Sequence, residues 1–202
     1  MNKTKLRLSL LLLLGSLALG SCSRSGGNEF TAEGTITDAA GKTLYLETTD
    51  TDEPQLIDSV TLDEKGRFRF RREAHSYPAF YRLRLGESFI PFAADSVTHL
   101  TLSASGKDLF STYKIESGDE ANKQIREISQ LRTATDKAIE AILTQLNNGT
   151  LDRGVALARI DSLSTQLKNT LTSKYIFSDP KGAAAYYALF QSYLGGTYFS
   201  ID

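Results

Sequence analysis

The sequence RFRFR at residues 67–71 alternates charged with aromatic side chains, and YRLRL at residues 81–85 repeats this alternation. Successive side chains of a β-strand point to opposite faces of a sheet, so a period of two predicts two half-buried strands. Their buried faces are expected to consist of Phe68 and Phe70 in the first strand and of Tyr81, Leu83 and Leu85 in the second. The arginines between them then lie on the outer faces.

Similar short segments, rich in β-branched and aromatic residues and separated by turn residues, flank these two strands on both sides. We predict eight strands, at residues 30–37, 43–48, 56–62, 67–72, 80–85, 88–92, 97–103 and 112–116. Short strands with turn signals at this spacing favour an antiparallel β-sandwich. Residues 30–117 are therefore expected to form one such domain of about seven or eight strands.

The hydrophobic period changes to between three and four after Gly118, which predicts helices. A long helix is expected to begin at Asp119, a residue type that caps helix N-termini, and to end at residues 147–149. Its predicted apolar face consists of Ile125, Ile128, Leu131, Thr135, Ile139, Ile142 and Leu146. A second helix follows, with an apolar face of Leu157, Ile160, Leu163, Leu167 and Leu171.

A third helix is predicted to open at Asp179-Pro180, with the aspartate as N-cap and the proline in the first turn, and to stop near residue 195. The predicted fold class is thus α+β, with about three helices over residues 118–202. The last segment is unusually aromatic, with Tyr186, Tyr187, Phe190, Tyr193, Tyr198 and Phe199. So many aromatic rings need cover, either from the other two helices or from something else.

The N-terminus carries three basic residues, an apolar run at residues 8–14 and small residues before Cys22, which is the pattern of a cleaved signal peptide. Residues 19–22, LGSC, resemble a bacterial lipobox, in which the cysteine is acylated after cleavage. An ordinary signal peptide with a chance cysteine is the alternative, but Cys22 is the only cysteine in the chain. We predict a signal peptide at residues 1–21, lipidation at Cys22, a tether at residues 22–29 and a periplasm-facing location in the cell envelope.

The chain has 23 basic and 24 acidic residues, and removal of residues 1–21 takes away three basic ones. The processed chain would then carry 20 basic and 24 acidic residues, a net charge of −4. This mildly acidic balance argues against nucleic-acid binding, which leaves a strongly basic footprint.

Few residue patterns point to chemistry. Residues 41–43, GKT, lack the spacing of a phosphate-binding loop and are interpreted as a hairpin turn. His75 and His99 stand alone and are expected to be exposed. Asp50, Asp52 and Glu53 could hold Ca²⁺, but a solvated acidic turn is favoured. No catalytic residue, metal site or cofactor is predicted.

Five arginines are candidates for an anion- or partner-binding patch, provided that their two strands pair: Arg67, Arg69, Arg71, Arg82 and Arg84. Arg72 would add to this cluster. The alternative, which we favour, is an outer sheet face balanced by nearby acids such as Asp58, Asp63 and Glu64.

The order of a lipobox, FTAEGTI (30–36), DSV (58–60) and GRFRF (66–70) resembles a β-domain of unknown function that opens thiol–disulfide oxidoreductase lipoproteins of the TlpA/ResA type. The segment from residue 118 and IFSDP (176–180) are similar to the helices that follow that domain. The resemblance implies a thioredoxin-like domain with a Cys-x-x-Cys pair, which this chain lacks. The family's catalytic residues therefore have no counterpart here.

The sequence thus predicts a lipid-anchored periplasmic accessory or binding module, without catalytic activity of its own, that positions or docks a thioredoxin-like partner. The alternative is the N-terminal portion of a thiol–disulfide oxidoreductase whose catalytic domain is absent from this chain. A sandwich that binds carbohydrate through aromatic residues is disfavoured because the chain has no Trp.

Overall fold

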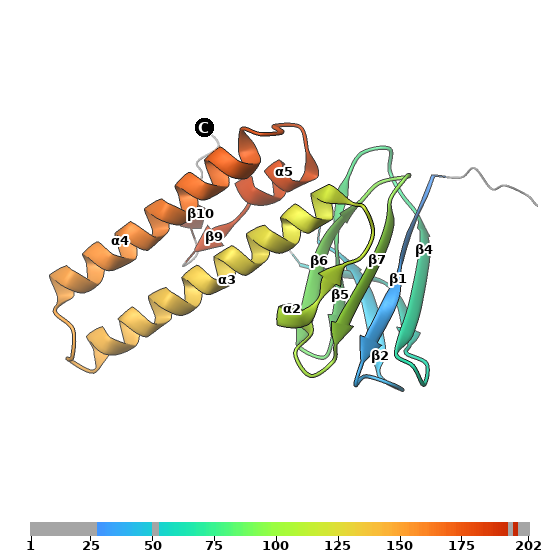
Figure 1. The fold of residues 1–202 in the computed structure, drawn as a ribbon, viewed down its shortest axis with the longest axis horizontal. Helices are drawn as coiled ribbons and strands as arrows, with labels where there is room; N and C mark the ends of the chain where they lie inside the picture. The colour runs from blue at the N-terminus through green and yellow to red at the C-terminus, as the bar shows by residue number, and fades with distance from the viewer. Residues whose placement is uncertain (1–27, 50–52, 194–195, 198–202) are drawn as a thin grey trace, which may run out of the picture.

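The computed structural model describes residues 28–49, 53–193 and 196–197. An N-terminal β-sandwich is followed by a helical region, which confirms the α+β class (Figure 1). The sandwich strands are β1 (Glu29–Thr37), β2 (Thr43–Thr48), β3 (Gln55–Thr61), β4 (Arg67–Glu73), β5 (Ala79–Leu85), β6 (Ser88–Ala94), β7 (His99–Ser105) and β8 (Lys114–Ile115). Each of the eight predicted strands overlaps one of these.

The strands form two four-stranded sheets. Sheet A has the order β4-β1-β7-β8 and sheet B the order β3-β2-β5-β6. All pairings are antiparallel except that of β1 with β7, which is parallel. The turn at residues 41–43 joins β1 of sheet A to β2 of sheet B, so the prediction of a hairpin at this turn is wrong. Gly41 adopts a left-handed φ of 75° there.

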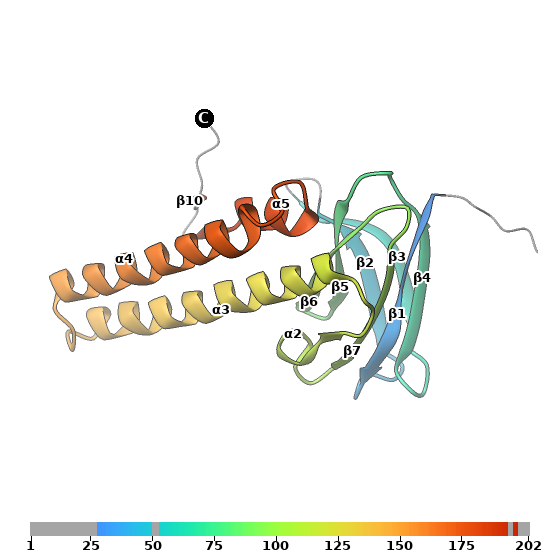
Figure 2. The ribbon, with the colours of Figure 1, turned by 45° about the horizontal axis from the view of Figure 1, so that its top comes forward.

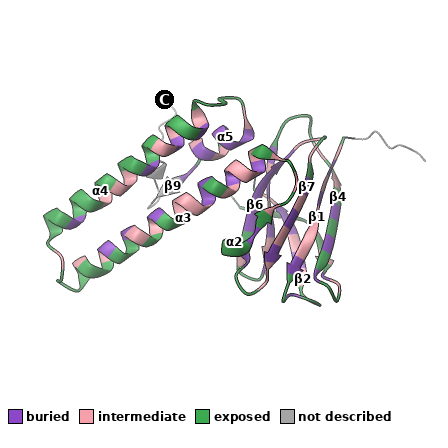
Figure 3. Cartoon of the chain, viewed as in Figure 1, coloured by how far each residue is buried: buried purple, intermediate pink, exposed green. Residues whose placement is uncertain are grey.

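The alternation that predicts the fold is confirmed at its buried positions. Phe70 is 1% exposed and Leu83 is fully buried, and buried positions alternate along the strands (purple in Figure 3). Phe30, Tyr81 and Phe92 pack together between the sheets, with ring centroids 4.8 to 6.1 Å apart. Each such buried side chain contributes about 1.5–3 kcal/mol by leaving water.

The turn between β3 and β4 requires a glycine. Gly66 has a φ of 74°, and a Cβ atom there would lie 2.0 Å from the carbonyl oxygen of Ile36. The same approach allows the Ile36 N–H to donate to the Gly66 carbonyl at 2.8 Å, which ties this turn to β1.

The helical region contains α3 (Glu120–Asn147), α4 (Arg153–Thr170), the π-helical segment η1 (Leu171–Ile176) and α5 (Ala183–Leu189), while the short α2 (Leu109–Thr112) precedes β8. Asp119 caps α3 by accepting the Asn122 N–H at 3.0 Å, as predicted. Gly149, with a φ of 69°, follows its end. The paired helices α3 and α4 extend away from the sandwich (Figures 1 and 2).

Two helix predictions are wrong in part. The third helix begins at Ala183, because the Asp179 carbonyl accepts the Gly182 N–H and closes a turn over residues 179–182. It ends at Leu189, where the Gln191 side chain donates to the Tyr187 carbonyl at 2.7 Å. The chain then forms a short pair of strands, β9 (Ser192–Tyr193) and β10 (Gly196–Thr197). In α4, Leu157 is 54% exposed, because only a narrow seam faces α3.

The helices join the sandwich at sheet B, where β6 is an edge strand. The Asn122 side chain accepts from the Ala93 N–H and donates to the Ala93 carbonyl, both at 2.8 Å. It thereby takes the place of a neighbouring strand at this point of the edge. Ala93 also packs into the hydrophobic core of the helices, which includes Ile125, Ile128, Leu167, Leu171 and Tyr175.

Candidate functional surfaces

The five arginines of the predicted patch do not share one surface. Arg67, Arg69 and Arg71 belong to β4 in sheet A, whereas Arg82 and Arg84 belong to β5 in sheet B. The two strands do not pair, because β4 lies beside β1 and β5 lies between β2 and β6. The condition for a single patch is therefore not met.

Each arginine of β4 has a carboxylate of its own. The ion pairs are Arg67 with Asp63 at 2.6 Å, Arg69 with Glu33 at 3.3 Å, Arg71 with Glu29 at 2.5 Å, and Arg72 with Asp58. The predicted balance by Asp58 and Asp63 is confirmed. Exposed pairs of this kind contribute about 0–1 kcal/mol each, so this face is a neutralised sheet surface.

The arginines of β5 differ because they share one carboxylate. Glu47 of β2 accepts from Arg82 Nε at 2.5 Å and from Arg84 Nε at 2.8 Å, and its side chain is only 7% exposed. Burial acts to raise the pKa of Glu47. Hydrogen bonds and charges from both arginines outweigh that effect, so the pKa lies below its ordinary value.

Two aromatic rings complete this group. Arg84 Cζ lies 4.4 Å from the ring centroid of Tyr45, and Arg82 Cζ lies 5.1 Å from that of Phe89. Both distances fall within the range of cation–π attraction. We call these five residues, Tyr45, Glu47, Arg82, Arg84 and Phe89, the arginine–aromatic cluster.

Sequence reasoning found the two arginines of this cluster but missed its other members. Tyr45 and Phe89 both lie opposite Arg84, and Glu47 lies opposite Arg82. These partners depend on strand order and register. The only local signal was the alternation of Leu44 to Glu47, which places Tyr45 and Glu47 on one face.

A second surface lies where the β4–β5 loop meets α5. A hollow of about 390 Å³ is lined by Tyr77, Pro78, Phe80, Lys181, Ala183 and Tyr186. Tyr77 is 61% exposed and Tyr186 is 50% exposed, and Phe190, one helical turn after Tyr186, is 60% exposed. We call this surface the aromatic hollow.

The predicted need for cover over the C-terminal aromatics is met only in part. Tyr187 packs inward, with its hydroxyl 2.8 Å from Ser129 Oγ and its ring 5.9 Å from that of Phe80. Burial raises the pKa of Tyr187 above its ordinary value. Tyr186 and Phe190 stay exposed. The Tyr193 side chain, Tyr198 and Phe199 lie outside the described part of the chain.

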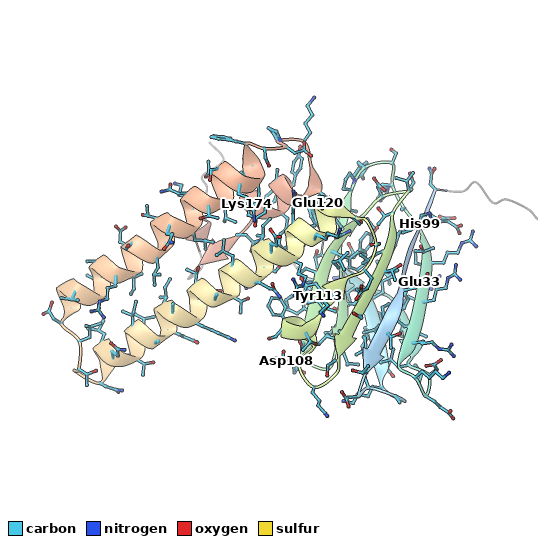
Figure 4. The ribbon with its side chains drawn as sticks, viewed as in Figure 1. Glu33, His99, Asp108, Tyr113, Glu120 and Lys174 are labelled. Carbon is cyan, nitrogen blue, oxygen red and sulfur yellow. The ribbon has the colours of Figure 1, made fainter. Side chains whose placement is uncertain are left out.

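Both histidines are exposed, as predicted. His75 stacks on Tyr77, with ring centroids 4.8 Å apart. His99 begins β7 (Figure 4), where its Nδ1 lies 2.9 Å from Thr31 Oγ1. Among the described residues, no three His, Cys, Asp or Glu side chains gather as metal ligands would.

The remaining predicted residues lie mostly outside the described part of the chain. These are Cys22, the signal peptide and the acidic pair Asp50 and Asp52, whereas Glu53 is described and exposed. Within the described ranges, no helix has the length and apolarity needed to span a membrane.

The fold and these surfaces define a β-sandwich that carries a helical arm, which consists of α3, α4, η1 and α5. Residues 30–124 match the family model of a domain of unknown function (DUF4369). The match includes the eight sandwich strands and the first turn of α3, and thus Asn122, but excludes most of the helical arm. No curated protein matches the chain. A domain of unknown function was predicted and is confirmed; its link to thiol–disulfide oxidoreductases stays a prediction.

Proposed function

We propose that this protein is a lipid-anchored accessory module of the cell envelope, tethered through Cys22, that docks a thioredoxin-like oxidoreductase through the aromatic hollow. The observation that carries the docking proposal is the exposure of Tyr77 and Tyr186 around one hollow, with Phe190 beside it. Contiguous exposed aromatic surface marks interaction sites, and tyrosine is enriched among residues that dominate binding energy.

The position of the hollow also supports docking rather than catalysis. It lies where the loop between β4 and β5 meets α5, so residues of the sandwich and of the helical region both contribute to its lining. Among the described residues that line it, Lys181 is the one ionisable side chain besides the tyrosines, and the others offer no nucleophile or acid–base pair. A largely apolar surface of aromatic residues with a cation beside it suits recognition of another protein.

The alternative function, as the N-terminal part of an oxidoreductase, uses the same surface. In this form, we propose that the thioredoxin-like domain follows β10 in the same chain and docks on the hollow. The gene sequence after codon 202 separates the two forms: an in-frame Cys-x-x-Cys segment makes docking intramolecular, whereas its absence makes it intermolecular.

One purification tests tether and docking together. Cells grown with a labelled fatty acid should give wild-type protein that carries the label and co-purifies with a thioredoxin-like protein. Cys22→Ser should lose the label, because the acyl chains have no attachment point. Tyr77→Ser/Tyr186→Ser should keep the label and lose most of the partner, since truncation of such aromatic anchors weakens binding by about 2 kcal/mol or more.

The matched control is Leu157→Ser, which changes an equally exposed apolar residue in α4, away from the hollow. This variant should retain both label and partner. A wild-type protein without label would refute the tether. Equal partner recovery from the double tyrosine variant and the Leu157 variant would refute docking at the hollow.

A further inference from the structure

The charge balance of the arginine–aromatic cluster sets it apart from the rest of the sandwich surface. On β4, four arginines pair with four different carboxylates. On β5, Arg82 and Arg84 share Glu47, and no other described carboxylate forms an ion pair with either of them. The cluster therefore keeps one uncompensated positive charge, on side chains that are 21% and 30% exposed.

The two guanidinium groups also keep unused hydrogen-bond donors. Each has five N–H groups, ten in all. Three hydrogen bonds use them: one from Arg82 to Glu47, one from Arg84 to Glu47, and one from Arg84 Nη1 to the Gly86 carbonyl at 3.2 Å. Among the described residues, the terminal nitrogens of Arg82 have no hydrogen-bond partner.

The guanidinium planes are held in place before any ligand arrives. Glu47 fixes both Nε atoms, and Tyr45 and Phe89 each lie against one guanidinium group. Holding long side chains in one geometry in advance reduces the entropy that binding must overcome. A fixed arginine fork matches the two oxygens of a carboxylate, and the aromatic rings beside it offer apolar contact.

We propose that the arginine–aromatic cluster is a recognition site for an acidic segment of a protein partner, in which a carboxylate meets Arg82 and Arg84 and a neighbouring apolar side chain meets Phe89. This site is separate from the aromatic hollow and does not depend on it. The choice of a protein segment over a lipid headgroup rests on the proposed tether at Cys22, because Arg84 lies near the end of the sandwich opposite to Glu29, where the tethered chain enters β1.

The test measures binding of a labelled peptide of alternating Glu and Leu to the full-length protein in detergent. Wild-type protein should bind this peptide, and a matched peptide with Lys in place of Glu should not bind. Arg82→Lys keeps a charge beside Glu47 but loses the planar fork, and should weaken binding about tenfold, equivalent to about 1.4 kcal/mol. Arg69→Gln, the matched control on β4, should leave affinity within about twofold.

A gain of affinity provides the sharpest readout, since a misfolded variant could not produce it. Glu47→Gln keeps a side-chain oxygen that can accept from the arginines but raises the charge of the cluster from +1 to +2, so the acidic peptide should bind about threefold tighter or better. Absence of wild-type binding, weaker binding by Glu47→Gln, or equal losses in Arg82→Lys and Arg69→Gln would overturn the proposal. Displacement of the peptide by inorganic phosphate or by a soluble short-chain phosphatidylglycerol would also overturn it, in favour of a free anion or a lipid headgroup.

Discussion

Glu47 differs from an ordinary surface acid because its side chain is buried between two arginines. A register shift between Leu46 and Glu47 lies beside it in the β2–β3 pairing, and its carboxylate lies between two guanidinium groups. Its pKa is lowered in the folded state despite burial. The ionised form is therefore favoured by folding, and its contribution to stability depends on pH.

Glu47→Gln should lower the free energy of unfolding by about 2 kcal/mol at neutral pH, because it removes charge-assisted hydrogen bonds to both arginines. Because the pKa of Glu47 is lower in the folded state, ionised Glu47 stabilises the folded protein at pH values above the ordinary pKa of 4.5. This stabilisation disappears as the pH falls through the folded-state pKa. The difference between wild type and variant in urea unfolding should thus be large at pH 7 and shrink below pH 4.5. A difference that is constant with pH would contradict this account.

At the scale of single residues, the sequence predicts which side chains are buried, but it does not predict which residues they pair with across the sheet. Phe70 and Leu83 are buried, because the period of two is a local consequence of strand geometry. Which carboxylate meets Arg82 depends on β2 being its neighbour, with Glu47 opposite it, across 35 residues of chain. Local alternation carries no information about such register.

At the scale of elements, the first turn of α3 connects the two halves of the fold. Asp119 accepts from both the Asn122 N–H and the Asn122 side chain, so the cap orients the amide that pairs with Ala93. The helix start and the covered edge of β6 are therefore one structural feature. Pro91, also in β6, agrees with an edge position, because proline cannot donate to a further strand.

Asn122→Ala should destabilise the protein by about 3 kcal/mol, because it leaves the buried N–H and carbonyl of Ala93 without these partners. The matched control is Asn169→Ala on the exposed face of α4, which should change stability by no more than about 0.5 kcal/mol. Chemical denaturation of both variants measures this. Equal effects would show that Asn122 does not secure the junction.

The helix boundaries show why local signals succeed in one place and fail in another. The start and end of α3 were predicted because Asp119 and Gly149 act on the adjoining backbone. The start of α5 was missed because the Asp179 carbonyl, rather than its side chain, closes the preceding turn. Leu157 was predicted to lie on the buried face of α4 but is exposed. The helix α4 packs against one neighbour, so its buried face is narrower than the apolar face of its sequence.

At the scale of the whole molecule, the sandwich and the helical arm lie at opposite ends of the long axis (Figure 1). The N-terminal strand β1 belongs to the sandwich, and the aromatic hollow lies between the sandwich and α5. The β4–β5 loop that lines the hollow begins at Ala74, whose N–H donates to the Asn28 carbonyl at 2.7 Å. A chain tethered before β1 would thus hold the hollow at the anchored end of the sandwich. The order of strands in the two sheets was not predictable from the sequence, and this order divides the arginines between two faces.

The docking claim is tested most directly by placing a photo-crosslinking amino acid at position 186 in cells. The account predicts a covalent adduct between this position and a thioredoxin-like protein, because the Tyr186 side chain faces the proposed partner. The same amino acid at position 157, equally exposed on α4, should give no such adduct. Absence of an adduct at position 186, or the same adduct at both positions, would contradict the account.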